Sequence, residues 1–166
     1  MANDVFRASD AVLVLAVDDK TTPEGAAADA LVTQYGLANS VARLSGVTIA
    51  VASDVQPFYE IGRRYPTHLR GGSVRTSGTV QRAHVNGALI RLLLGDGATS
   101  PPGSANFVQP SFNIIATLQD SAHPDSNVKV IVFGVKFTSW QAQIPQEDFV
   151  MEQASFEALR VAYEEA

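Results

Sequence analysis

Three segments of the chain alternate between apolar and polar side chains from one residue to the next: residues 47–53, 73–83 and 110–120. A period of two is typical of a β-strand that has one face on a core and the other in water. Residues 128–137 instead carry apolar side chains on both faces, which predicts a strand that is covered on both sides. The sequence therefore predicts a mainly β fold in which several strands have one wet face.

One segment has a helical period. Four apolar side chains within residues 85–94 fall at helical spacing: Ala88, Leu89, Leu92 and Leu93. Gly95 follows them as a stop signal, and we expect this helix to pack on a sheet. Residues 149–162 leave helix and strand open, because their Glu, Ala, Leu and Arg residues favour a helix while their Val and Phe residues suit a strand.

The length of 166 residues is typical of one domain, and we treat residues 1–166 as one. Three segments rich in Gly, Pro, Ser, Asn and Asp are expected to be loops: residues 19–25, 95–106 and 121–127. The apolar stretch at residues 11–17 is far too short to cross a bilayer, and no export signal is recognisable. We therefore expect a protein that is neither exported by a classical signal nor embedded in a membrane.

Side chains that perform catalysis or bind metals are sparse. The chain has no cysteine, which excludes disulfides, thiolate metal sites and cysteine nucleophiles. Its three histidines, His68, His84 and His123, have no partner at metal-ligand spacing. No phosphate-binding loop, nucleophile elbow or dinucleotide fingerprint occurs, and the adjacent acids at 18–19 and 147–148 are typical of solvated loops. The sequence predicts neither an enzyme nor a cofactor or metal site.

The charges are distributed unevenly. Residues 61–95 contain six arginines and no acid, whereas the net charge of the whole chain is -5 and the C-terminal residues are mostly acidic. Three interpretations of the arginines are open: a solvated face, a nucleic-acid site, or an interface between proteins. The low pI of about 5.1 argues against nucleic acid. We favour the interface, because opposite charges on two surfaces of one chain can join copies head to tail.

Several short motifs occur in an order that resembles the tail tube proteins of bacteriophages. The run at residues 57–66 (PFYEIGRRYP) has the aromatic, acidic, apolar, Gly and Arg pattern of the central segment in that family. A Gly71-Gly72 turn follows it, and then a Ser-Gly-x-apolar-x-Arg strand at residues 77–82 that leads into a short helix. Residues 132–160 resemble the end of the family. The similarity covers about two thirds of the chain, and an N-terminal arm of about residues 1–40 matches poorly.

This resemblance implies a β-sandwich or small barrel that is flanked by one helix. Six copies would form a ring in which inner strands make a shared barrel, and stacked rings would form a hollow tube that conducts DNA from capsid to host. The implied partners are further copies, tip or baseplate, terminator and possibly sheath proteins, with genomic DNA passing through without specific binding. The implied location is the virion tail, and the host cytoplasm before assembly.

The resemblance and the alternation together nominate residues for two surfaces. The candidates for the wall of the channel are Ser73, Arg75, Ser77, Thr79 and Gln81. The candidates for contacts between subunits are Tyr59, Glu60, Arg63, Arg64, Arg70, Glu147 and Asp148. We expect an acid of a neighbouring subunit to pair with Arg75, and the loop at residues 59–70 to bring Arg63 and Arg64 to acids of an adjacent ring.

Two alternatives remain at this point. The same architecture serves type VI secretion and contractile injection particles, whose tubes pass proteins rather than DNA. The chain could also be a monomeric β-barrel that binds a small molecule or nucleic acid.

Overall fold

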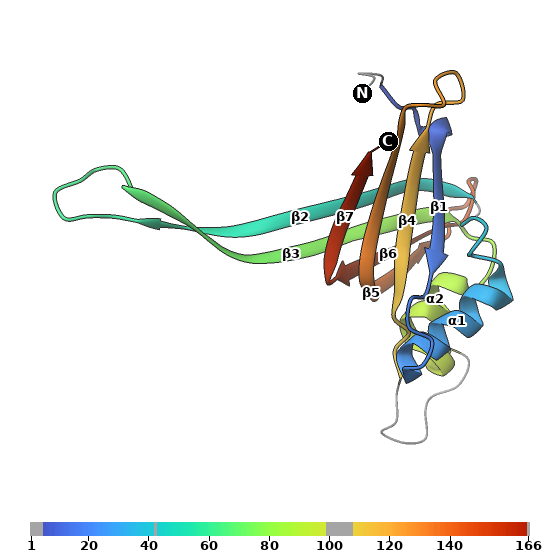
Figure 1. The fold of residues 1–166 in the computed structure, drawn as a ribbon. Coiled ribbons are helices and arrows are strands. Elements are labelled where there is room, and N and C mark those ends of the chain that lie inside the picture. Colours follow the sequence, from blue (N-terminus) through green and yellow to red (C-terminus); the bar gives the residue numbers. More distant parts are fainter. Residues whose placement is uncertain (1–4, 42, 99–107, 166) are drawn as a thin grey trace.

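The computed structural model describes residues 5–41, 43–98 and 108–165. Within them, seven strands and two α-helices follow one another (Figure 1). The elements are β1 (Ala11–Ala16), α1 (Pro23–Tyr35), β2 (Leu44–Phe58), β3 (His68–Ala83), α2 (Ala88–Leu94), β4 (Phe112–Gln119), β5 (Asn127–Gln143), β6 (Met151–Ala158) and β7 (Arg160–Glu165). Single 3-10 turns lie at Ala8–Asp10 and Gly95–Ala98. No helix of the described residues is long and apolar enough to span a membrane.

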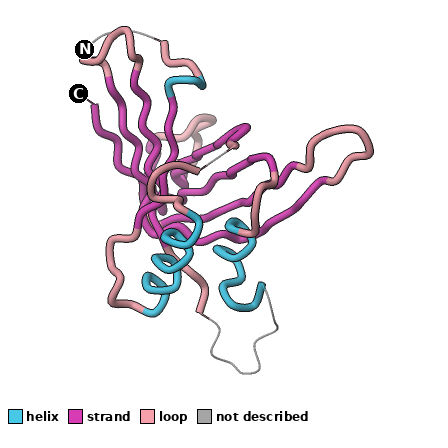
Figure 2. The backbone as a smooth tube through the Cα atoms, turned by 90° about the vertical axis from the view of Figure 1, so that its right-hand side faces the viewer, coloured by secondary structure: helices cyan, strands magenta, loops and turns pink. Residues whose placement is uncertain are grey.

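The strands form two antiparallel sheets that share β5. The first sheet has the order β1-β4-β5-β7, and the second has the order β2-β3-β6-β5. The first half of β5 pairs with β4 and β7, and its second half, from Lys136 on, pairs with β6. Figure 2 shows the two sheets spreading apart from this shared strand.

Gly134 lies where β5 passes from one sheet to the other. Its φ is +64°, a conformation that favours glycine, and a Cβ there would meet the side chain of Leu159 at 2.5 Å. The amide of Gly134 donates to the side chain of Asn113 on β4 (3.1 Å). The sequence thus allows one strand to bend at this point and serve both sheets.

The core lies between the two sheets and the two helices. Thr22 caps the start of α1, where its hydroxyl accepts from the amide of Gly25 (3.1 Å), and Gly36 in the left-handed conformation follows the last residue of the helix. Aliphatic side chains of both helices pack against Phe112, Phe137 and Phe156 of the sheets. Phe112 and Phe137 meet edge to face, with ring centroids 5.2 Å apart.

A buried ionic network ties the second sheet to α2. Glu152 accepts from Arg82 Nε at 2.5 Å, from Trp140 Nε1 at 3.0 Å, and lies 3.1 Å from His84 Nδ1. Arg82 also donates to the side chain of Asn86 (2.9 Å), which in turn accepts from the first amide of α2. Both charges of the Arg82–Glu152 pair are fully buried, so their mutual pairing is what makes the burial tolerable.

The outer half of the β2–β3 hairpin leaves the body of the molecule. We call residues 51–75 the arm; it projects far beyond the sheets (Figure 1), and each of its residues is exposed. The loop at its tip, residues 59–67, is closed by backbone hydrogen bonds from Thr67 to Phe58 (2.9 Å) and from Arg63 to Glu60 (3.1 Å).

The strands expected from the sequence are confirmed within β2, β3, β4 and β5, and the expected helix is α2. The open question at residues 149–162 is resolved as strands β6 and β7. The expectation of a single flanking helix was wrong, because α1 also packs on the core, and it begins inside the expected loop at residues 19–25. Residues 95–98 of the second expected loop form a 3-10 turn, and the rest of that loop, residues 99–106, lies outside the described residues.

Candidate assembly surfaces

One face of the second sheet is polar across all four strands. Thr79 pairs in register with Thr48 on β2 and with Ser155 on β6, and Ser155 pairs with Ser139 on β5. In a neighbouring row, Gln81 donates to the side chain of Gln153 (2.9 Å). The opposite face carries the buried Thr76, Val80 and Arg82. The alternation in β3 therefore separates a dry face from a wet face.

Four of the five candidates for a channel wall lie along this polar side of β3. Arg75 and Gln81 are exposed, and Ser77 and Thr79 are half-buried between neighbouring strands. Ser73 lies farther out, in the arm, beside a register shift between Ser53 and Val55 of β2. Four of the five candidates thus share one continuous face within and next to the body.

Arg75 has a partner inside its own chain. It forms an ion pair with Glu157 of the adjacent strand β6, and both side chains are exposed. The expectation that a neighbouring subunit supplies the acid is therefore not needed. On this face a positive and a negative charge lie side by side and cancel.

The six arginines of residues 61–95 do not form one basic patch. Arg82 is buried with Glu152, and Arg91 lies between the helices, where it donates to Tyr35 Oη (3.3 Å). The acid-free segment therefore suggested a larger basic surface than the fold presents. Arg75 is paired with Glu157, and the three that remain, Arg63, Arg64 and Arg70, are exposed in the outer part of the arm.

The candidates for subunit contacts fall into two groups at opposite ends of the second sheet. Tyr59, Glu60, Arg63, Arg64 and Arg70 lie at or near the arm tip and are exposed. Glu147 and Asp148 are exposed in the turn between β5 and β6, where Met151 pairs with Ala83 at the far end of β3. Within one chain the two groups are therefore separated by the length of the second sheet.

The arm also has an uncovered apolar side, which the sequence analysis missed. Val51, Val55, Leu69 and Val74 lie on the side of the hairpin that continues the core-facing residues of β2 and β3. Their exposed fractions range from 49% for Val55 to 70% for Leu69. The alternation of residues 47–53, extended to Val55 and across the hairpin, is the signal that could have revealed them.

Both edges of the second sheet are free in the described part of the chain. β2 is the last strand on one side, and residues 136–143 of β5 pair only with β6 on the other. A strand edge presents unpaired amides and carbonyls that another strand can bind. At Phe137 the carbonyl is already bonded by the side chain of Gln109 (2.6 Å).

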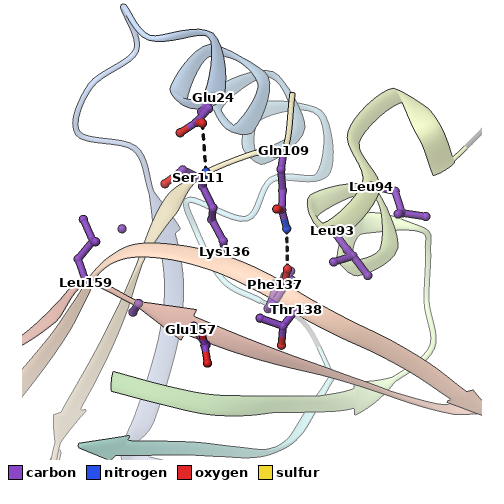
Figure 3. A pocket seen from close by; sticks show the side chains of 12 residues that line it. Glu24, Leu93, Leu94, Gln109, Ser111, Lys136, Phe137, Thr138, Glu157 and Leu159 are labelled. Carbon is purple, nitrogen blue, oxygen red and sulfur yellow. Dashed lines mark hydrogen bonds and ion pairs between the residues drawn. The ribbon is translucent and has the colours of Figure 1, made fainter. Parts of the chain in front are cut away.

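A groove of about 800 Å³ opens beside this β5 edge (Figure 3). Leu93 and Leu94 of α2 line one side, and Leu159, which is 81% exposed, lines another. Lys136 of β5 reaches Glu24 of α1 across it (3.1 Å). The groove is therefore a partly apolar surface in which the main charges are paired.

The described residues contain no cluster of three or more His, Asp or Glu side chains that could hold a metal. His84 joins the buried network, and His123 lies 2.9 Å from Asp120 in the β4–β5 turn. The hydrogen bond from His123 and a second one from the amide of Ala122 lower the pKa of Asp120.

Comparison with solved structures defines the fold. A chain in the structure of the sheath/tube terminator of an extracellular contractile injection system (PVC) matches with a TM-score of 0.64 at 12% identity, covering 99% of each chain. A chain of the tube-terminating cap of the anti-feeding prophage matches at 0.62 and 12%, covering 100% of this chain and 95% of that one. The tail tube of SPP1 matches at 0.53 and 12%, covering 98% and 80%.

This chain has the tail-tube fold. The expectation of a mainly β, tail-tube-like architecture is therefore confirmed. No protein-family model matches the sequence, and no curated protein matches it. The segment of about residues 1–40, whose sequence resembles the family poorly, supplies β1 and α1 of this fold.

Proposed function

We propose that this protein is a non-enzymatic structural subunit of a hollow tube. Six copies form a ring when the free β2 edge of one second sheet pairs with the free β5 edge of the next. The observation that supports this proposal best is a four-stranded sheet with two free edges and one polar face. A closed barrel removes such edges, and its polar face lines a wet channel.

The size of such a ring suits a conduit for nucleic acid. Four strands from each of six copies make a 24-strand barrel with a backbone radius of roughly 25 Å at the usual strand spacing and tilt. The channel side chains would be mostly Ser, Thr and Gln, with Arg75 neutralised by Glu157. A wall without net charge gives passing DNA little to bind.

Rings stack head to tail in this proposal. The arm tip of one ring, with Arg63 and Arg64, meets Glu147 and Asp148 in the β5–β6 turn of the next, because these opposite charges lie at opposite ends of the same sheet. Terminator, tip or baseplate and sheath proteins would bind such a tube. The location would be the virion tail, and the host cytoplasm before assembly.

A tube that passes protein cargo is the second candidate. It is favoured by the matches to a contractile injection system and to the anti-feeding prophage cap, whose TM-scores exceed that of the SPP1 tail tube. Purified particles distinguish the two: nuclease-protected DNA within the tube supports the phage tail, and protein in the lumen supports the injection system.

Electron microscopy of the purified protein at high concentration tests the tube itself. Rings or tubes with a central hole support it, and dispersed monomers, even with a nucleating tip complex added, favour a monomeric barrel. For stacking, the Arg63→Glu, Arg64→Glu double variant should leave rings intact but shorten tubes, and added Glu147→Lys, Asp148→Lys should restore them. Stacking that persists in the double variant and in molar salt would contradict the charge pairing, since salt screens exposed pairs.

A further inference from the structure

The apolar side of the arm lacks a cover that the body could supply. Ile49 of β2 packs against the core of the body. The same side continues outward with Val51 (57% exposed), Val55 (49%) and, on β3, Leu69 (70%) and Val74 (64%). An isolated two-stranded hairpin is marginally stable in water, and a row of exposed apolar side chains marks a contact surface. The arm therefore needs a partner with an apolar surface.

The groove at the β5 edge has the matching character. Leu94 of α2 is partly exposed in the groove, and Leu159 is mostly exposed. Lys136 and Glu24 form an ion pair with each other. Gly134 forms part of its lining and adds no side chain. Because α2 contributes Leu93 and Leu94, the groove reaches the helix side of the second sheet, which is also the side to which the arm's apolar residues belong. Glu157, the partner of Arg75, lines it from the polar side.

Strand directions bring these two surfaces together in a ring. Three antiparallel pairings separate β2 from β5, so β2 runs antiparallel to β5. In a ring, a neighbour's β2 that pairs with the β5 edge also runs antiparallel to β5. It would therefore start near Gln143 and run toward Lys136. Its continuation, the arm, then leaves the edge where the groove lies.

We propose that the arm of one copy docks its apolar side into the groove of its neighbour in the same ring. The occupant is a second copy of this chain, and the contact joins Val51, Val55, Leu69 or Val74 of one copy to Leu94 and Leu159 of the other. This inference rests on the ring described above, because it takes the edge pairing of β2 with β5 as its starting point. Docking of the arm in the groove then adds to the stability of the β2–β5 pairing between the two copies.

Disulfide trapping tests the contact, since the chain contains no cysteine of its own. Each of Val51→Cys, Val55→Cys, Leu69→Cys and Val74→Cys, carrying a mass tag, is mixed with untagged Leu94→Cys or Leu159→Cys, assembled and oxidised. A disulfide forms only where two Cα atoms come within about 7 Å. We expect a tagged–untagged dimer for at least one pair, at a yield at least fivefold above that of two controls.

The controls use matched positions. Gln56→Cys neighbours Val55 on the opposite side of the arm, and Asp125→Cys lies in the β4–β5 turn. Rings seen by microscopy without a cross-link from any arm position to Leu94 or Leu159, or with equal cross-linking of the controls, overturn the docking and leave the ring standing. Dispersed monomers in every mixture overturn the ring and the docking together, and microscopy separates this outcome from the former.

Discussion

The apolar side of β2 and β3 is covered in the body and exposed to solvent in the arm. Within the body Val80 of β3 is 2% exposed and belongs to the core, whereas Val74, on the same side of the same strand, is 64% exposed. The apolar pattern hardly changes along the hairpin. Alternation thus determines which side of a strand is dry, and a second surface, inside the chain or on another copy, determines whether it is covered.

A local irregularity lies in the inner part of the arm, close to the body. Between the pairs Ser53–Val74 and Val55–Gly71, one residue of β2 faces two of β3, which is a β-bulge. Gly72 belongs to this bulge, and a Cβ there would meet the carbonyl oxygen of Asp54 at 2.6 Å. A bulge bends and twists a strand, so the arm is aimed away from the sheet by its own sequence.

The largest expected effect tests whether the body is stable by itself. Glu152→Ala removes the only carboxylate that the structure shows bonded to the buried Arg82, and it also deprives Trp140 of its acceptor. Breaking a buried pair leaves an uncompensated charge and costs about 3–5 kcal/mol. Urea unfolding of the variant at low protein concentration measures the loss.

Glu157→Ala is the matched control. It removes the exposed partner of Arg75 from the same strand, and exposed pairs contribute about 0–1 kcal/mol. Equal losses for the two variants would show that the buried network is not what holds the second sheet to α2.

Sequence patterns found the parts of the fold that depend on one strand or helix at a time. The period of two located β2, β3 and β4, the continuous apolar run located β5, and Gly95 marked the end of α2. α1 escaped because its residues are mostly small and its first turn, Pro-Glu-Gly, resembles a loop. β1 has an apolar run too short to show a clear period, and its place beside β4 depends on distant residues.

The candidate surfaces were predictable to a smaller extent, because charges and contacts depend on pairing between strands. The sequence around Arg82 does not predict its pairing with Glu152, which lies 70 positions later. The same holds for Arg75 and Glu157, which meet only because β3 lies beside β6. The arginine count was therefore informative about the arm and misleading about the body.

A second prediction separates folding from assembly within the arm. Val55→Asp places a charge on the apolar side of the arm, which is exposed in the monomer, so the free energy of unfolding should change by less than about 0.5 kcal/mol. In the tube the same charge would be buried without a partner, and the critical concentration for assembly should rise at least tenfold, about 1.4 kcal/mol. Unfolding curves and sedimentation of tubes measure the two quantities.

Gln56→Asp adds the same charge one residue away, on the polar side of the arm. It should assemble with a critical concentration within about twofold of the parent protein. If the two variants assemble equally well, the apolar side of the arm faces solvent in the tube as well, and the contrast between body and arm does not depend on assembly.

The smallest effect concerns the β4–β5 turn of the body, where the side chain of Asp120 accepts a hydrogen bond from the amide of Ala122; at the arm tip the acceptors are the backbone carbonyls of Phe58 and Glu60. Because hydrogen bonds lower the pKa of Asp120 in the folded state, its contribution to stability is present above the unfolded value near 3.8 and disappears as pH falls through the folded pKa. Asp120→Asn should therefore be slightly less stable than the parent protein at pH 5 and equal to it at the lowest pH. Asp125→Asn removes the same charge from the same turn and is the matched control. If both variants shift the pH profile of unfolding alike, the change in net charge, rather than the loss of the hydrogen bonds to Asp120, is responsible for the shift.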